Sequence, residues 1–443
     1  MVKWSMGEIA TLEHALLNAV IAQEANLATV PPRLRAVRQN AMRHFSATGL
    51  PTRKDEAWRW TDLSALRKQQ ANITPSTSID PHALSGPFAK IDAFQLVFIN
   101  GVLRDDLSAI ALPAGVRAGS MRTALRDDPA LAERLSDNPS SPFLSLNTAL
   151  LNDGAFIHVD RDTRLLKPLH LIFFNTGNAQ IRNLVLLEAR ADITLLESHF
   201  GPAGADYFTN QASDVQLGEG ARLAHYRDQA ESQNALHFYF LNTRLDAHTH
   251  YDGFTLTRGA HLSRFEAHIE ISGANAECSL NGVSMLNRSQ IADTTCIMAH
   301  RAPASASRQM FRNVLAEKSQ GVFQGLIRVA KPAQRTDATQ QIKAMLLSPH
   351  AAQNSKPELE ILADDVKCAH GASVGQLDEA ALFYLRARGI DEAQARALLI
   401  GAFLEDAVAQ IQGGAALNAE QIQQNIQATI SAWLSQKLVN ENV

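Results

Sequence analysis

The first 150 residues space many of their apolar side chains as amphipathic helices do. Helical intervals occur in Glu8–Asn26 and return in Leu34–Thr48, where a glycine ends the pattern. Ser, Thr, Pro and Gly are frequent in Ser76–Pro87, which indicates a linker. Phe94–Gly101 is typical of a strand that enters a turn. We therefore predict a mostly helical N-terminal region over residues 1–150.

From residue 151 to residue 375 the pattern changes to short β-type runs separated by turns. Hairpin dipeptides are few and no helical stretch lies between the runs, which disfavours a sandwich and a βαβ fold. Strands stacked into a parallel β-helix fit better. The runs are Leu169–Phe174, Leu184–Leu187, Ile193–Leu196, Phe238–Phe240 and His268–Ile271, and the turns are Asn175–Asn178, Gly218–Gly220, Arg258–Gly259 and Ser272–Gly273.

Residues 376–443 return to helical spacing. A helix over Asp378–Arg388 would end at Gly389, because glycine readily adopts the left-handed conformation of a helix C-terminus. Asp391 and Asn418 can each cap a further helix. The sequence thus predicts a C-terminal helical domain.

Composition and charge restrict the class of protein. The 443 residues carry a net charge of −4 and are 46% hydrophobic, as in ordinary globular proteins. No basic block offers a footprint for nucleic acid, and no apolar run reaches the roughly 20 residues that span a bilayer. The first residues lack the apolar core of a signal peptide, and three cysteines make no disulfide framework. We expect a cytoplasmic protein that binds neither nucleic acid nor membranes.

Cys368 and His370 stand where strand-like sequence gives way to helix-like sequence. Residues i and i+2 of a strand point to the same face, so this thiol and this imidazole can address one target. The pair suits iron, zinc or an iron–sulfur cluster, but two ligands do not close a tetrahedral site. A partner chain is an obvious source of the others. The alternative is structural: a buried cysteine that packs as a small hydrophobe, and a histidine in a turn.

Other candidate residues are expected to be structural. His248 and His250 have same-face spacing on a strand but no third ligand nearby in the sequence, and a solvated face of the solenoid suits them better. Cys278 and Cys296 lack a Cys-x-x-Cys partner and should lie in the core. Asp364–Asp365 should form a turn, because adjacent strand residues point to opposite faces. The histidines assigned with His248 and His250 to the solvated face are His237, His261, His268 and His300.

Three segments resemble the SufD family, scaffold subunits of the SUF machine that assembles iron–sulfur clusters. The longest is Pro357–Ile390, which contains P-E-L-E-I-L-A-D-D-V-K-C-A-H-G-A-S-V-G-Q-L-D and then F-Y-L-R-A-R-G-I. Pro51–Thr61 and Arg308–Gly325 resemble further elements of that family. The cysteine that the related SufB subunit carries before its Glu-Ile strand is absent from Met345–Asn354, which favours the D type.

The resemblance implies a mainly β fold, with a right-handed parallel β-helix core between two helical domains. It implies a non-catalytic scaffold whose core pairs with a SufB-like paralogue and whose C-terminal helices dock a SufC-like ATPase. Alone, the chain could form a homodimer. No cofactor would be bound stably. Iron or a nascent iron–sulfur cluster would reside transiently at the SufB interface, with His370 as a ligand and Cys368 as either a packing residue or an auxiliary ligand.

Two other classes of function stay open at this point. β-Helices also host carbohydrate-active enzymes, which need clustered carboxylates and are commonly secreted, and neither feature is evident in this sequence. A purely structural β-helix would make His370 dispensable. The chain has no Gly-x-x-x-x-Gly-Lys-Ser/Thr loop, no Gly-x-Ser-x-Gly elbow and no His-Glu-x-x-His helix.

Overall fold

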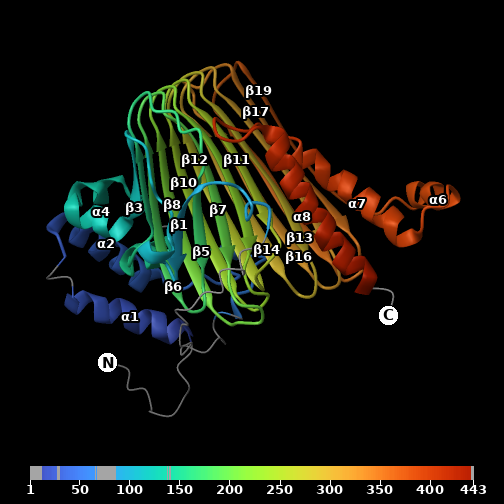
Figure 1. Cartoon of the computed structure of the whole chain (residues 1–443), viewed down its shortest axis with the longest axis horizontal. Helices are drawn as coiled ribbons and strands as arrows, with labels where there is room; N and C mark the ends of the chain where they lie inside the picture. The colour runs from blue at the N-terminus through green and yellow to red at the C-terminus, as the bar shows by residue number, and fades with distance from the viewer. Residues whose placement is uncertain are drawn as a thin grey trace, which may run out of the picture.

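The computed structural model describes residues 12–26, 30–64, 66, 86–136, 138 and 141–440. Its body consists of two large sheets that enclose a shared apolar core, with helices at both ends of the chain (Figure 1). No described helix combines the length and apolar character needed to cross a lipid bilayer.

Strands of the two sheets alternate along the chain. The ten-stranded sheet contains β1 (Phe94–Ile99), β2 (Val102–Leu103), β5 (Leu169–Phe174), β7 (Asp192–Phe200), β9 (Arg222–Ala230), β11 (His250–Thr257), β13 (Glu277–Leu286), β15 (Ala306–Leu315), β17 (Thr336–Leu346) and β19 (Val366–Gln376). The nine-stranded sheet contains β3 (Val116–Ser120), β4 (Ala155–Val159), β6 (Ala179–Leu187), β8 (Phe208–Leu217), β10 (Leu236–Leu245), β12 (Leu262–Ile271), β14 (Ile291–His300), β16 (Gln320–Val329) and β18 (Ala352–Ile361).

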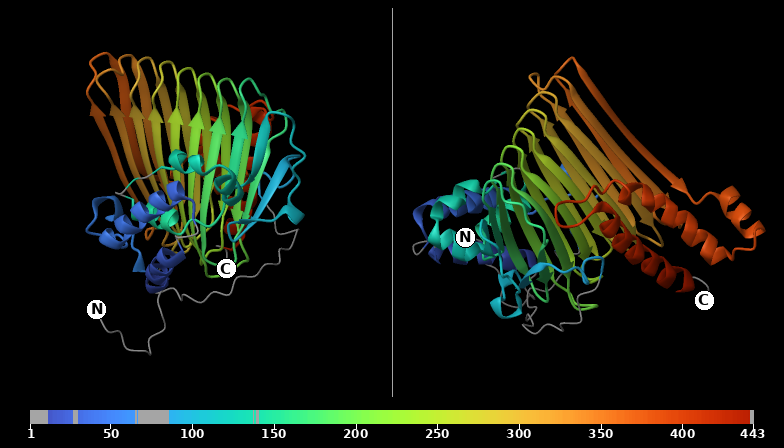
Figure 2. Two further views of the ribbon diagram at one scale, coloured as in Figure 1. Left: turned by 90° about the vertical axis from the view of Figure 1, so that its left-hand side faces the viewer. Right: turned by 45° about the horizontal axis from the view of Figure 1, so that its top comes forward.

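The sheets are the two walls of a parallel β-solenoid (Figure 2). From β4 onward each strand pairs in parallel with the strand two further along, so one rung contributes one strand to each wall. Leu236 stacks on Leu262, and Arg328 stacks on Glu360. The two residues of the second pair are further apart in the sequence than those of the first, so the rungs differ in length. Rungs of unequal length explain why the sequence shows no strict period. The mainly β prediction is confirmed, and each predicted β run lies within a strand.

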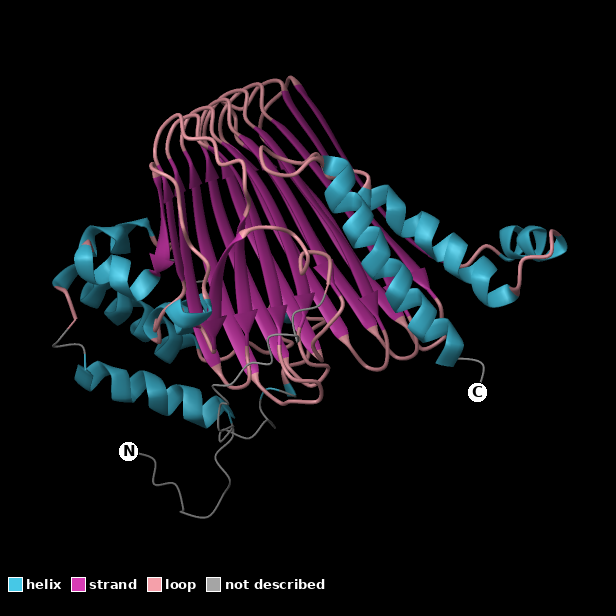
Figure 3. Cartoon of the chain, in the orientation of Figure 1, coloured by secondary structure: helices cyan, strands magenta, loops and turns pink. Residues whose placement is uncertain are grey.

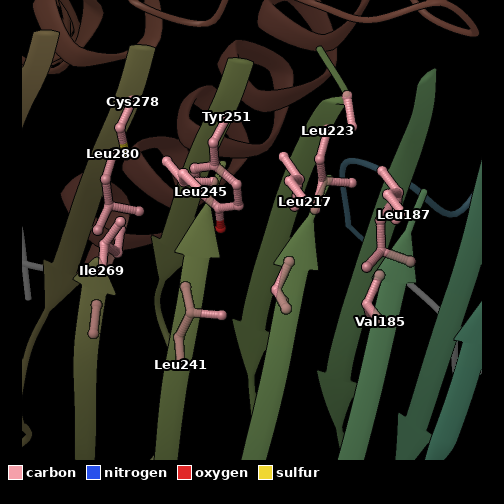
Figure 4. Close-up of a cluster of buried hydrophobic side chains, with 14 of the residues drawn as sticks. Val185, Leu187, Leu217, Leu223, Leu241, Leu245, Tyr251, Ile269, Cys278 and Leu280 are labelled. Carbon is pink, nitrogen blue, oxygen red and sulfur yellow. The ribbon is translucent and has the colours of Figure 1, made fainter. Parts of the chain in front are cut away.

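Strand alternation builds the core, because every second side chain of each wall points inward. Leu217, Leu241 and Leu245 come from the nine-stranded wall and meet Leu223 and Leu280 from the other (Figure 4). The predicted core cysteines, Cys278 and Cys296, are both buried there.

One column of turns repeats along an edge of the solenoid. In each turn a residue with positive φ donates its amide hydrogen to a carbonyl of the next turn. The donor and acceptor pairs are Arg190 to Glu219, Gly220 to Ala247, His248 to Ala274, Asn275 to Pro303, Ala304 to Gln334 and Arg335 to Asp365. The left-handed conformation costs a non-glycine residue about 1–2 kcal/mol, which these hydrogen bonds help to offset.

The N-terminal helices lie against the outer face of the nine-stranded wall (Figure 3). Trp58 anchors them, with its ring 5.2 Å from Phe143 and stacked under the Arg264 guanidinium at 4.0 Å. The α-helices here are α1 (Leu12–Asn26), α2 (Pro32–Thr48), α4 (Met121–Asp127) and α5 (Pro142–Ala149), and the 3₁₀ turns are η2 (Glu56–Trp58), η4 (Asp105–Leu107) and η5 (Pro129–Arg134). Most of the predicted linker, and the start of the first predicted helix, lie outside the described residues.

Three C-terminal helices follow β19: α6 (Glu379–Ala387), α7 (Glu392–Val408) and α8 (Ala419–Asn440). The Asp391 carboxylate accepts a hydrogen bond from the Gln394 amide at 3.0 Å, and Asn418 caps α8 in the same way through Gln421 at 2.9 Å. Helices α7 and α8 cover the outer face of the ten-stranded wall with buried side chains such as Ile400 and Ile426. The predicted helices and caps are therefore present.

Candidate functional site

The solenoid ends in an uncovered rung. Among the described strands, β18 pairs only with β16 and β19 only with β17, so each wall finishes in a strand with one free edge (Figure 2). We call this end, formed by β18, β19 and the turn between them, the open end. Backbone groups along such edges are available for pairing with another chain.

Cys368 and His370 both lie on β19, so the structure brings them to the open end. Cys368 stacks beside Ala338 and packs against the inner core, whereas His370 stacks beside Gln340 and is exposed. The i, i+2 relation gives both side chains the inward face. His370 is exposed on that face because no further rung of the described chain covers it.

Apolar side chains surround this pair. Leu359 packs against the end of the core from β18, and Ile361 on the same strand is 37% exposed. Val374 on β19 is 50% exposed, and Leu362 in the connecting turn is 60% exposed. The open end thus presents apolar surface around one thiol and one imidazole, as an interface to another protein would.

Cys368 and His370 offer two potential ligand atoms, a thiol sulfur and an imidazole nitrogen, on one strand. Burial raises the pKa of the Cys368 thiol, so most of it is protonated at neutral pH and a metal would have to displace that proton. The His370 side chain has no hydrogen bond or ion pair with any described residue. In the part of the chain that is described, no third Cys, His, Asp or Glu joins the pair within ligating distance. Further ligands would have to come from outside these residues.

Asp364 and Asp365 form the bend between β18 and β19, as the sequence predicted. The carbonyl of Asp365 accepts the hydrogen bond from the Arg335 amide at 2.6 Å and so closes the column of turns at the open end. The backbone of this bend, which also donates the Asp365 amide hydrogen to the Gln334 side chain at 2.9 Å, thus holds the start of the strand that carries Cys368 and His370.

The prediction that the histidines line a solvated face is wrong for two of them. His237 and His300 are buried, with exposed fractions of 1% and 0%. The prediction that His248 and His250 lie on the same strand is also wrong. His248 occupies a turn with φ 57°, and β11 begins only at His250. Turn geometry that the sequence does not reveal accounts for this displacement.

A buried polar cluster inside the solenoid was missed in the sequence. Glu197 accepts hydrogen bonds from His199 and His225, each at 2.9 Å, and from the Tyr239 hydroxyl at 3.0 Å. Burial alone would raise the pKa of Glu197, but the two histidines outweigh it and hold that pKa well below its usual range. Arg227 lies over the Tyr239 ring at 4.2 Å. The sequence did contain a signal for this cluster. Inward-facing side chains occupy every second position of β7, and Glu197 continues the series of Ile193 and Leu195.

An apolar surface also occurs on the C-terminal helices. Phe383 and Tyr384 of α6 are 72% and 57% exposed, and Leu398 of α7 is 50% exposed. We call these three residues the α6 surface. Helix α6 projects away from both walls (Figure 1), which leaves this surface accessible.

Comparison with known proteins identifies the architecture. Residues 173–403 match the family model of the SUF system FeS cluster assembly, SufBD core domain, and residues 18–171 match that of the SufBD protein N-terminal region. The chain belongs to the SufBD family. The two SufBD matches meet within β5, although β1 to β4 already extend both walls.

Three relatives show how far the similarity extends. An iron–sulfur cluster assembly SufBD family protein of Synechocystis is 33% identical over 84% of this chain and 86% of its own length. Protein ABCI7, chloroplastic, of Arabidopsis thaliana is 31% identical over 84% of this chain and 81% of its own length. The iron–sulfur cluster assembly protein SufD of Escherichia coli is 30% identical over 82% of this chain and 86% of its own length. The chain is therefore a SufD homologue within the SufBD family.

Proposed function

We propose that this chain is a non-catalytic, cytoplasmic scaffold subunit that pairs with a SufB-like paralogue through the open end. Iron or the nascent iron–sulfur cluster is its cargo, and no cofactor is held permanently. His370 contributes a ligand to that cargo, while Cys368 packs beneath it or assists.

The observation that carries this proposal is the uncovered last rung. Two strand edges, the exposed side chains Ile361, Leu362 and Val374, and an unpartnered imidazole occur together at one end of the molecule. A partner that continued the walls would cover the apolar surface and could bring the missing ligands to His370. The same end could pair with a second copy when the chain is alone, which gives the homodimer.

The α6 surface supports a second contact. Two exposed aromatic side chains on a projecting helix are the kind of anchor that protein interfaces bury. We assign this surface to a SufC-like ATPase, which would then act at a distance from the open end.

The test is co-expression of the full chain with its SufB-like and SufC-like partners, followed by anaerobic purification and measurement of iron and acid-labile sulfide. We expect one complex that contains all three proteins and carries iron and sulfide. Recovery of this chain as a separate species under those conditions would contradict the proposal.

A further inference from the structure

Inside the solenoid, three ionisable side chains from different strands and turns converge. His199 lies on β7, Glu231 directly follows β9, and His237 lies on β10 of the opposite wall. One potential ligand atom from each lies within 4.8 Å of the other two. We call these residues the buried trio, since none is more than 2% exposed.

Each imidazole of the buried trio keeps one nitrogen free. His199 bonds the Glu197 carboxylate through Nε2 at 2.9 Å, and its Nδ1 has no partner. His237 bonds the Thr209 hydroxyl through Nδ1 at 2.8 Å, and its Nε2 has no partner. Metal-bound histidines commonly donate their second ring N–H to a carboxylate or another acceptor, which fixes the ring orientation. Both rings already have that outer contact.

Glu231 lacks a permanent counter-charge. Its carboxylate accepts hydrogen bonds from the Tyr207 hydroxyl and from Asn175 Nδ2, the latter at 3.2 Å. Among described residues, no lysine or arginine lies within 4.0 Å of it, and its ion-pair partner is His237 at 3.4 Å. A buried carboxylate without a cation is costly.

We propose that the buried trio binds one divalent transition-metal ion, Zn²⁺ or Fe²⁺. Two imidazole nitrogens and one carboxylate oxygen form a ligand set that both metals accept. The ion would neutralise Glu231, whose Oε1 lies 3.4 Å from His237 Nδ1, and tie the two walls together. β7 is six strand intervals from β19, roughly 29 Å at about 4.8 Å per interval, so this ion is distinct from cargo at His370.

The test uses the full chain produced separately with Zn²⁺ or, under anaerobic conditions, with Fe²⁺. After desalting, metal per chain is measured by mass spectrometry for wild type, His199→Gln, Glu231→Gln and two controls. His300→Gln is the matched control, because His300 is also buried but bonds Ser305 and Ser307 through its two nitrogens. His370→Ala removes the exposed imidazole of the open end.

We expect about one metal ion per chain in wild type and both controls, and at least a tenfold loss in His199→Gln and Glu231→Gln. Circular dichroism verifies that each variant is folded. If the trio variants do not fold, the visible spectrum of Co²⁺-loaded wild type decides, because histidine and carboxylate ligands give characteristic d–d bands. A metal-free wild type, or equal metal content in all variants, would show a hydrogen-bonded core without an ion. Loss only in His370→Ala would overturn the buried site and leave the proposed function intact.

Discussion

At the scale of single residues, Cys368 and His370 share a face but differ in environment. The thiol packs against the core and has a raised pKa, whereas the imidazole is exposed at the uncovered rung. A ligand for incoming cargo must be accessible from outside the chain. The exposed histidine meets that condition better than the partly buried cysteine.

His370→Ala should therefore leave the complex with the SufB-like and SufC-like partners assembled but lower its iron and acid-labile sulfide at least about tenfold. Cys368→Ala should have a milder effect, because the thiol mainly fills space. Both quantities are measured per purified complex at matched stoichiometry. Normal iron and sulfide in the His370→Ala complex would falsify the ligand role.

His300 allows a test of pH-dependent stability. Burial lowers its pKa from 6.5 to about 4, so below pH 6.5 the unfolded chain binds a proton that the folded chain does not. This group thus contributes stability above pH 6.5 that is lost as the pH falls toward 4. Between pH 7 and pH 5, His300→Gln should reduce the drop in unfolding free energy by about 2 kcal/mol, measured by urea unfolding. An unchanged pH dependence would refute the assignment.

The sequence predicted the candidate pair at the open end but not the polar residues that meet inside the solenoid. Strand spacing was enough to place Cys368 and His370 on one face, because that relation is local. The buried trio depends on which rungs stack, and rungs of unequal length hide the register that brings Glu231 beside His237. Polar residues that continue an inward face, such as His199 after Leu195, were the available signal.

At the scale of elements, the C-terminal helices differ in position, because α7 and α8 cover one wall whereas α6 projects away from both. Helices α7 and α8 cover apolar side chains of the ten-stranded wall, including Leu256 and Met285. Removing residues 378–443 would expose that wall, so a truncation tests folding as well as docking. Substitutions on α6 avoid this difficulty, since the α6 surface lies outside the packed cluster.

Phe383→Asp should weaken binding to a SufC-like ATPase about 10- to 30-fold, because a charge replaces an exposed aromatic anchor. Leu166→Asp is the matched control, since Leu166 is 70% exposed in the turn before β5. Affinity is measured by calorimetry with the purified ATPase, and thermal unfolding should be unchanged in both variants. Equal affinity for the two variants would exclude the α6 surface as the docking site.

At the scale of the whole molecule, the two ends of the ten-stranded wall are not equivalent. One end finishes in the short β2, which pairs antiparallel with β1, and the other in the eleven-residue β19. Short edge strands resist pairing with other chains, whereas long uncovered ones favour it. The solenoid fold could be predicted from the sequence. The difference between its two ends could not, because it depends on which strand is the last one in each wall.

Val374→Arg should reduce pairing with the SufB-like paralogue, because it places a charge on the apolar inner face of β19. Leu107→Arg, in the 3₁₀ turn after β2 at the opposite end, should leave pairing intact. Light scattering coupled to size exclusion distinguishes a heterodimer from separate chains. Intact heterodimer with Val374→Arg would place the interface elsewhere.

The column of turns carries a consequence for motion. Each turn is held by a hydrogen bond to the next one, and in solenoids stability is approximately a sum of nearest-neighbour terms. The rung that contains β18 and β19 has a neighbour on one side only, so its backbone amides should exchange with deuterium sooner than those of β11 or β13. Because Cys368 and His370 lie on that rung, docking of a partner would slow this exchange as well as cover the surface. Binding of the partner and ordering of Cys368 and His370 would then occur in one step. Local opening of the last rung would make the chain alone a weak binder of the proposed iron or cluster.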